Sequence, residues 1–158
     1  MATVGAAHQP FQEAILEVAR SRKVGFGLEE GVEMGPVISN ESRERIEALI
    51  EEGAGDGASL SMDGRSPRIP GYEDGYFVGP TILSDVHPES DLAATEIFGP
   101  VLSLLPFERV SDAIDFANSG RYGNMACLFT RSGSAARRFR YEVEAGNIGI
   151  NIGVAAPV

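Results

Sequence analysis

The sequence predicts an α/β fold with a mainly parallel, twisted sheet and flanking helices. After residue 99, three nearly continuous apolar runs alternate with two segments of helical spacing. Unbroken apolar runs are typical of strands covered on both faces, and this βαβαβ order favours parallel strands with right-handed crossovers. The predicted strands are residues 100–107, 124–130 and 147–153, and the predicted helices between them are residues 111–120 and 132–146.

The first element of the chain is predicted to be an amphipathic helix over residues 10–24. A proline suits its first turn, and apolar side chains recur at helical spacing along one face. The glycine-rich residues 25–36 then predict a structured loop. A second helix is expected to begin near Ser39 or Asn40 and to end in the glycine-rich residues 53–58.

Two short strands are predicted next, over residues 58–64 and 76–83. The residues between them are rich in proline and glycine, which predicts a surface loop. The two strands either pair antiparallel or lie apart, and the sequence leaves both arrangements open. The two later helices carry residues suited to their ends: Ser111 and Ser132 or Ser134 as N-caps, and Gly120 and Gly146 as C-terminal stops.

Composition excludes several classes of partner. The chain has 158 residues, with 13 Lys and Arg against 23 Asp and Glu, so its formal charge of -10 repels nucleic acid and anionic membranes. It has no apolar run near the roughly 18 residues of a membrane span and no signal-peptide pattern. The single cysteine suits a reducing compartment. These features predict a soluble, cytoplasmic protein with no nucleic acid and no membrane as partner.

Other candidate motifs have simpler interpretations. The glycines of residues 53–58 follow a helix, whereas a dinucleotide-binding fingerprint follows a strand, and no GxxxxGK[ST] sequence occurs. His8 and His87 have no Cys or His at metal-ligand spacing, so no metal site is predicted. Cys127 lies in a predicted buried strand and is expected to be buried and unreactive. The arginines of residues 137–140 are expected to form a solvated helix face that pairs with nearby glutamates.

The segment TEIFGPV, residues 95–101, is the strongest candidate for ligand contact. A carboxylate can accept hydrogen bonds from two neighbouring hydroxyls, as on a ribose, and an aromatic ring can cover a flat heterocycle. Glu96 and Phe98 have these capacities. Residue chemistry alone leaves two readings open, a ligand-binding loop or the polar edge of a buried strand.

Several motifs occur together in one order along the chain. These are GYFVGPTIL at residues 75–83, EIFGPV at residues 96–101, YGNMACLFT at residues 122–130 and EAGNIGIN at residues 144–151. The ordered set resembles the aldehyde dehydrogenase superfamily over nearly the whole chain. The segments DGR, GYEDGYFVGPTI, TRSGSAARRF and VEAGNIGINIGVAAPV are most similar to its CoA-acylating methylmalonate-semialdehyde dehydrogenase branch.

The resemblance implies roles for three residues. Glu96 matches the family glutamate that holds the nicotinamide ribose hydroxyls of NAD, and Phe98 matches the aromatic residue near the nicotinamide. Asn151 matches an asparagine expected to be structural or pocket-lining. Thr95 departs from the family's usual second acidic residue, which is not the ribose ligand. In the complete enzyme the implied reaction oxidises a small aldehyde, (methyl)malonate semialdehyde, with NAD as cofactor and CoA as acyl acceptor.

The resemblance also implies what this sequence lacks. The family's nucleophilic cysteine belongs to a Gly-Gln-x-Cys stretch, which does not occur here. Its general-base glutamate, its oxyanion-holding asparagine and its Rossmann-like NAD-binding domain are expected before residue 1. Residues 1–158 are therefore expected to be a fragment of the catalytic domain, inactive alone and with no catalytic residue of its own, from an enzyme that is a homo-oligomer. The alternative is a non-catalytic α/β module that binds a partner through an uncovered sheet edge or apolar face.

Overall fold

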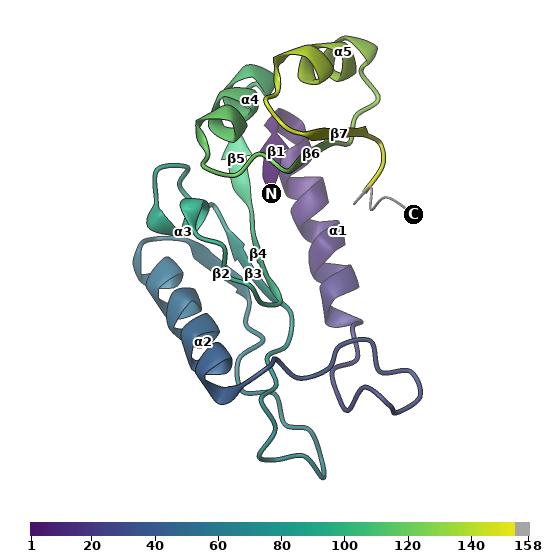
Figure 1. Ribbon diagram of the computed structural model, residues 1–158, viewed down its shortest axis with the longest axis vertical. Coiled ribbons are helices and arrows are strands. Elements are labelled where there is room, and N and C mark those ends of the chain that lie inside the picture. Colours follow the sequence, from purple (N-terminus) through teal and green to yellow (C-terminus); the bar gives the residue numbers. More distant parts are fainter. Residues whose placement is uncertain (154–158) are drawn as a thin grey trace. The chain divides into compact units, whose positions relative to one another are not determined.

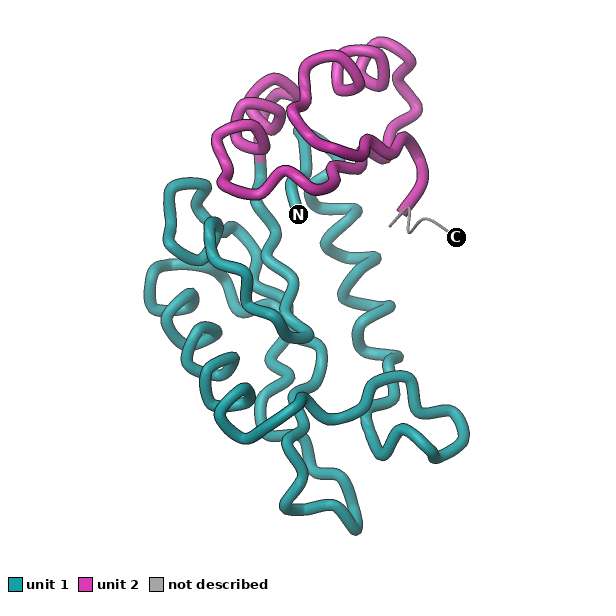
Figure 2. Tube along the Cα trace, viewed as in Figure 1, with its two compact units in different colours: residues 1–106 teal, residues 107–158 magenta. Residues whose placement is uncertain are grey.

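The computed structural model describes residues 1–153, which form helices and short strands with two parallel strand pairs, so the predicted α/β class is confirmed. The chain divides into two compact units, Met1–Pro106 and Phe107–Val158 (Figure 2). Within residues 1–153, no helix is long and apolar enough to cross a membrane.

The first unit holds most of the secondary structure. In chain order its elements are β1 (Ala2–Val4), the 3-10 helix η1 (Gly5–Ala7), α1 (His8–Arg20), α2 (Asn40–Gly55), β2 (Ser59–Met62), β3 (Thr81–Ser84), α3 (Asp91–Ala94), β4 (Val101–Ser103) and β5 (Leu105–Phe107). The last residue of β5 belongs to the second unit.

A three-stranded sheet with the order β2-β3-β4 forms the centre of the first unit. β3 pairs antiparallel with β2 and parallel with β4, with Thr81 opposite Val101. All four residues of β3 are buried. The two strands whose arrangement the sequence left open are therefore an antiparallel pair. The second starts at Thr81 rather than at residue 76, since the preceding Pro80 has no N–H to donate to a ladder.

α1 and α2 cover opposite faces of this sheet (Figure 1). On one face, Ile82 joins a buried cluster with Ala19 of α1 and with Leu104. On the other face, a Cβ added to Gly53 of α2 would lie 3.4 Å from the Leu83 side chain. Successive residues of a strand point to opposite faces, which is why Ile82 and Leu83 are buried by different helices.

The apolar run at residues 100–107 forms two strands instead of the single predicted one. β4 pairs with β3, whereas β5 lies beside β1, with the Leu105 amide donating to the Met1 carbonyl at 3.0 Å. Leu104 lies between the two strands, is fully buried and donates its amide to the Leu83 carbonyl at 2.8 Å. Hydrophobicity predicted the burial of this run but could not indicate its change of partner.

The second unit is a βαβ motif preceded by a helix. Its elements are α4 (Val110–Ser119), β6 (Met125–Leu128), α5 (Gly133–Glu142) and β7 (Asn147–Ile150). β6 and β7 are parallel, and α5 is the crossover between them, as predicted. The core of this unit contains Ile114 of α4 and Phe139 of α5, packed against Ala126, Leu128 and Ile150 of the strands.

The sequence predicts that the strands near Val101, Asn124 and Ile148 share one sheet, and this is wrong for the described residues. β4 belongs to the sheet of the first unit, while β6 and β7 form a separate two-stranded sheet. A strand's apolar pattern reports that it is buried, not which strand lies beside it. For the same reason α4, which links β5 to β6, does not join two paired strands as predicted.

The predicted N-cap Ser132 is confirmed, and the predicted N-cap Ser111 is wrong. The Ser39 hydroxyl accepts from the Ser42 amide at 3.2 Å at the start of α2, and Ser132 caps α5 in the same way. α4 starts after Arg109, which gives no side-chain cap, and Ser111 lies inside the helix. Its hydroxyl donates to Asp112 at 3.1 Å instead.

Two other helix ends, the start of α1 and the end of α5, differ from prediction by a few residues. α1 begins at His8, two residues before the predicted proline start, and α5 ends at Glu142 rather than at Gly146. Gly120 does end α4 as predicted.

Candidate functional site

The candidate ligand-contact residues lie on the loop of residues 95–101, which connects α3 to β4. Ser90 caps α3 by accepting from the Ala93 amide at 3.3 Å. The Thr95 hydroxyl donates to the Asp91 carbonyl at 2.8 Å, which closes this short helix. The loop therefore leaves a fixed helix end and enters the amino end of β4.

Glu96 and Phe98 both project into solvent on either side of a buried residue. Ile97 is 7% exposed, whereas the Phe98 side chain is 82% exposed and Glu96 is also exposed. Phe98 has a φ of 55°, in the left-handed region that L-residues rarely adopt. This conformation places an aromatic ring outside the core, where burial contributes nothing to stability.

Three contacts fix the backbone of the loop. A guanidinium nitrogen of Arg45, Nη2, donates to the Ile97 carbonyl. Gly99 packs against Ile46, because an added Cβ there would lie 2.6 Å from the Ile46 Cδ1 atom. The amide of the first residue of β3 donates to the Pro100 carbonyl at 2.9 Å. The loop is thus held by α2 and by the central strand of the sheet.

The exposed side chains remain available for a ligand. Within residues 1–153, Glu96 makes no hydrogen bond and no ion pair, so both carboxylate oxygens are free to accept. A carboxylate can bind two adjacent hydroxyls, and the Phe98 ring offers an open face. The two predicted residues lie two positions apart on one loop whose backbone is anchored at three points.

An apolar groove of about 360 Å³ lies beside the end of this loop. Its lining combines α1 with β3, β4 and the Gly99-Pro100 turn: Ile15, Val18, Ala19, Arg22, Met34, Pro80, Thr81, Ile82, Gly99, Pro100, Val101 and Leu102. The end of the loop lines this groove, but the side chains of Glu96 and Phe98 do not.

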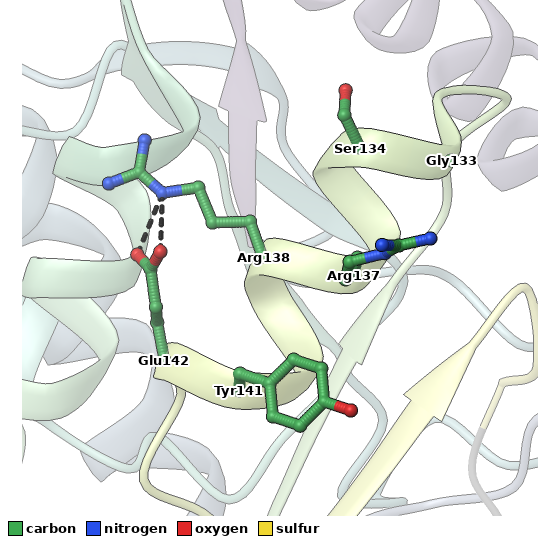
Figure 3. Close-up of a pocket in the computed structure, with 6 residues that line it drawn as sticks. All are labelled: Gly133, Ser134, Arg137, Arg138, Tyr141 and Glu142. Carbon is green, nitrogen blue, oxygen red and sulfur yellow. Dashed lines mark hydrogen bonds and ion pairs between the residues drawn. The ribbon is translucent and has the colours of Figure 1, made fainter.

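A second hollow, on the outer side of α5, has no such arrangement (Figure 3). Its volume is about 430 Å³, and all its lining residues come from one helix. The Arg138 Nε donates to both carboxylate oxygens of Glu142, at 2.8 and 2.7 Å. The Arg140 guanidinium lies 5.7 Å from the Tyr141 ring centroid. The basic run is a solvated helix face with an internal ion pair, as predicted, and no reactive group converges on it.

Cys127 is exposed, so the prediction that it is buried is wrong. Along β6, Ala126 and Leu128 point to the covered face and pack on the core of the second unit, whereas Cys127 points to the other face. Phe129, which follows the strand, is 66% exposed. The helices of this unit cover only one face of its two-stranded sheet, whereas the sequence interpretation assumed that both faces were covered. The expectation of an unreactive thiol therefore loses its physical basis.

Asn151 has a structural role at the end of β7. Its side chain accepts from the Thr130 amide at 2.8 Å and donates to the Thr130 carbonyl at 3.0 Å. Its own amide donates to the Leu128 carbonyl at 2.8 Å, and its φ is 54°. These bonds join the ends of β6 and β7. Of the two roles expected for Asn151 from the sequence, structural or pocket-lining, they agree with the structural one.

The histidines are engaged in local contacts. His8 Nδ1 lies 2.6 Å from the Thr3 hydroxyl, and His87 Nδ1 accepts from the Glu89 amide at 3.3 Å. Over the described part of the chain, no group of three or more His, Cys, Asp or Glu side chains is placed to hold a metal ion.

Sequence reasoning missed Arg45 and Ile46, which support the candidate loop. Arg45 and Ile97 are 52 residues apart, and no local pattern links a helix residue to a distant backbone carbonyl.

Comparisons with known proteins identify what this chain is similar to. A family model described as Aldehyde dehydrogenase family matches residues 4–157. A methylmalonate-semialdehyde dehydrogenase (acylating) of Arabidopsis thaliana, named as mitochondrial, is 47% identical over 142 residues, which cover 90% of this chain and 23% of that protein.

Two solved structures have the same fold over 99% of this chain. One, from Sinorhizobium meliloti 1021, is assigned as a methylmalonate-semialdehyde dehydrogenase and was solved with NAD; its TM-score is 0.95 at 35% identity. The other is the methylmalonate-semialdehyde dehydrogenase of Oceanimonas doudoroffii, with a TM-score of 0.94 at 37% identity. The chain spans 32% of the length of each.

Proposed function

The chain belongs to the aldehyde dehydrogenase family, and we propose that its loop 95–101 positions the nicotinamide end of NAD. Glu96 accepts hydrogen bonds from the two hydroxyls of the nicotinamide ribose, and Phe98 packs beside the nicotinamide ring. The observation that carries this proposal is that both side chains project from a backbone fixed at three points, with no competing partner among the described residues.

The chemistry of the loop fits this cofactor. A ribose presents two adjacent hydroxyl donors, and the Glu96 carboxylate has two free acceptor oxygens. The exposed ring of Phe98 can cover a flat heterocycle two positions further along the loop. A hydrogen bond to a charged acceptor contributes about 1.5–3 kcal/mol net, which is enough to orient a ligand end that is already bound elsewhere.

When bound, NAD supplies a hydride acceptor, and the residues of this chain hold it in place. Correct orientation of reacting groups contributes several orders of magnitude in rate, and a displacement of about 1 Å can cost roughly 100-fold. Glu96 and Phe98 therefore act on the geometry of the hydride step. The nucleophile, the general base and the nucleotide-binding domain belong, in this proposal, to other parts of a longer polypeptide.

The substrate and acyl acceptor follow from the relatives. The Arabidopsis protein is named as an acylating methylmalonate-semialdehyde dehydrogenase. We extend this to the present protein as a proposal: the longer enzyme oxidises (methyl)malonate semialdehyde to an acyl-CoA, with NAD as hydride acceptor and CoA as acyl acceptor.

Three further expectations stay predictions. Residues 1–158 are a fragment of a catalytic domain, the complete enzyme is a homo-oligomer, and the protein is cytoplasmic. The name of the Arabidopsis relative places that protein in mitochondria, so its likeness does not support the last of these.

The proposed function can be tested in a chimeric protein, called the exchange enzyme below, in which the present chain replaces the matching residues of the Arabidopsis relative. Single-turnover kinetics of this exchange enzyme measure the rate of hydride transfer. The change Glu96→Gln keeps the shape of the side chain but removes its charge. We expect it to slow hydride transfer about tenfold, equivalent to about 1.4 kcal/mol, and to change NAD affinity less than about threefold.

Glu89→Gln is the matched control, since Glu89 is another exposed glutamate a few residues earlier in the chain. It should leave both quantities unchanged. A hydride step that is equally fast with and without the Glu96 carboxylate would remove this residue from the mechanism.

A further inference from the structure

We infer that Arg45 is a positioning residue for the cofactor loop, which it holds through the Ile97 carbonyl. This inference rests on the function proposed for loop 95–101. Arg45 acts on the backbone between Glu96 and Phe98, and it therefore sets the position of both side chains at once.

The contact is direct and spans two distant segments. Arg45 lies in the second turn of α2, and its Nη2 donates to the carbonyl of Ile97, 52 residues later. A hydrogen bond from a charged donor is roughly twice as strong as one between neutral groups. Within residues 1–153 this is the only hydrogen bond of the Arg45 side chain, so the guanidinium is not shared with a competing acceptor there.

The same helix supports the loop a second time, by packing. Ile46, the next residue of α2, is fully buried and touches Gly99 so closely that no Cβ fits there. The two anchors differ in kind. Ile46 is part of the core, so truncating it would open a core cavity and destabilise the unit, whereas Arg45 is exposed and can be replaced without opening such a cavity.

Arg45 acts through the backbone and not through the Glu96 charge. Over the described residues, no ion pair joins Arg45 to Glu96. The carboxylate is left free for ribose hydroxyls while the guanidinium fixes the neighbouring carbonyl. Loss of Arg45 should therefore loosen the loop without changing the chemistry of its side chains.

The first test uses the 158-residue chain itself. Chymotrypsin can cleave after exposed aromatic residues, and both Phe98 and Phe129 are exposed. With the Arg45 hydrogen bond lost, we expect Arg45→Gln to speed cleavage after Phe98 about tenfold, because the loop opens more often. Cleavage after Phe129, in the other unit, should not change and serves as the internal standard.

Two further variants separate position from charge. Arg45→Lys keeps a charged donor and should restore slow cleavage in part. Arg68→Gln removes the same charge from an exposed loop residue that has no hydrogen bond or ion pair within the described chain, and it should behave as the native chain. Equal cleavage after Phe98 in the native, Arg45→Gln and Arg68→Gln chains would overturn the inference.

The second test uses the exchange enzyme and separates this inference from the proposed function. Arg45→Gln should slow single-turnover hydride transfer about tenfold and change NAD affinity less than about threefold. If Glu96→Gln slows the hydride step and Arg45→Gln does not, the role of Arg45 is wrong. If Glu96→Gln has no effect, the proposed function of the loop is wrong, and the cleavage experiment alone then decides whether Arg45 fixes the loop.

Discussion

Phe98 is unfavourable for the stability of the fold at the position that it occupies. Its φ of 55° is a conformation that costs an L-residue about 1–2 kcal/mol relative to glycine, and its ring is 82% exposed. A glycine would relieve the backbone, and a polar residue would suit the solvent. An aromatic ring here has a physical reason only if something outside the described residues packs on it.

Substitutions at Phe98 should therefore leave the fold intact. We expect Phe98→Ala to change the free energy of unfolding by less than about 0.5 kcal/mol, since little surface is buried. Phe98→Gly should be more stable than Phe98→Ala by about 1 kcal/mol, because glycine adopts the left-handed conformation freely. Urea denaturation measures both differences.

The control for this prediction is a phenylalanine of the same unit. Phe77 is 5% exposed, and Phe77→Ala should cost about 3–5 kcal/mol. If Phe98→Ala proved as destabilising as Phe77→Ala, the ring of Phe98 would be packed in solution and unavailable to a nicotinamide.

Some residues of the candidate site could be predicted from their side-chain chemistry, whereas others depend on contacts that only the folded structure shows. Residue chemistry made Glu96 and Phe98 candidates for ligand contact but left a strand-edge loop as the alternative, and the family resemblance supplied their expected roles. Cys127 was misjudged because an apolar run does not say whether one or both faces of its sheet are covered. Arg45 could not be found at all, since its acceptor is a backbone carbonyl that carries no sequence signal.

At the scale of elements, N-caps decide where the helices start. Ser39 has extended backbone angles, and its hydroxyl accepts from the Ser42 amide, which otherwise has no partner in the first turn. α2 is the helix that supports the loop of residues 95–101. A cap at its first turn therefore contributes to the stability of the candidate site.

Ser39, which caps α2, and Ser111, which was predicted to cap α4, should differ sharply when truncated. We expect Ser39→Ala to lower the free energy of unfolding by about 1 kcal/mol, the usual cost of losing a capping hydroxyl. Ser111→Ala should cost less than about 0.5 kcal/mol, because Ser111 lies inside α4 and caps nothing.

Thermal or urea unfolding of the two variants checks this pair. Each serves as the control for the other, since both remove one hydroxyl near a helix start. Equal losses would mean that the serine at the start of α2 does not cap it in solution.

Helices were easier to predict than strands for a physical reason. A helix is held by bonds within one segment, so α1, α2, α4 and α5 were all predictable to within a few residues from spacing and caps. A strand is defined by its neighbour. The single run at residues 100–107 has two different neighbours, so it became β4 and β5 with Leu104 between them.

At the scale of the whole chain, each unit has its own core. Ala19, Ile82 and Leu104 centre the cluster of the first unit, and Ile114, Phe139 and Val143 that of the second. The sequence predicted the right elements but a sheet that ran through both. The order of strands and helices in the sequence carries no signal at the boundary between the units, which falls within β5, after Pro106.

The last prediction concerns a polypeptide of these 158 residues taken alone. We expect it to show no aldehyde oxidation, because it lacks a Gly-Gln-x-Cys nucleophile, and to bind NAD more weakly than micromolar. Glu96 can offer two hydrogen bonds to ribose hydroxyls, each contributing about 1.5–3 kcal/mol. Immobilising a dinucleotide costs at least about 4 kcal/mol, so little net affinity remains.

Calorimetric titration with NAD measures this affinity, and formation of NADH measures the activity. The Glu96→Gln chain is the matched control, since any weak binding that depends on the carboxylate should fall further in it. In the longer enzyme that we propose, we expect a different balance of free energies, because other residues would already hold the rest of the cofactor and the carboxylate would need only to orient one end. Micromolar binding by the isolated chain would mean that the cofactor site lies largely within these residues, and that orientation is not the main contribution of Glu96.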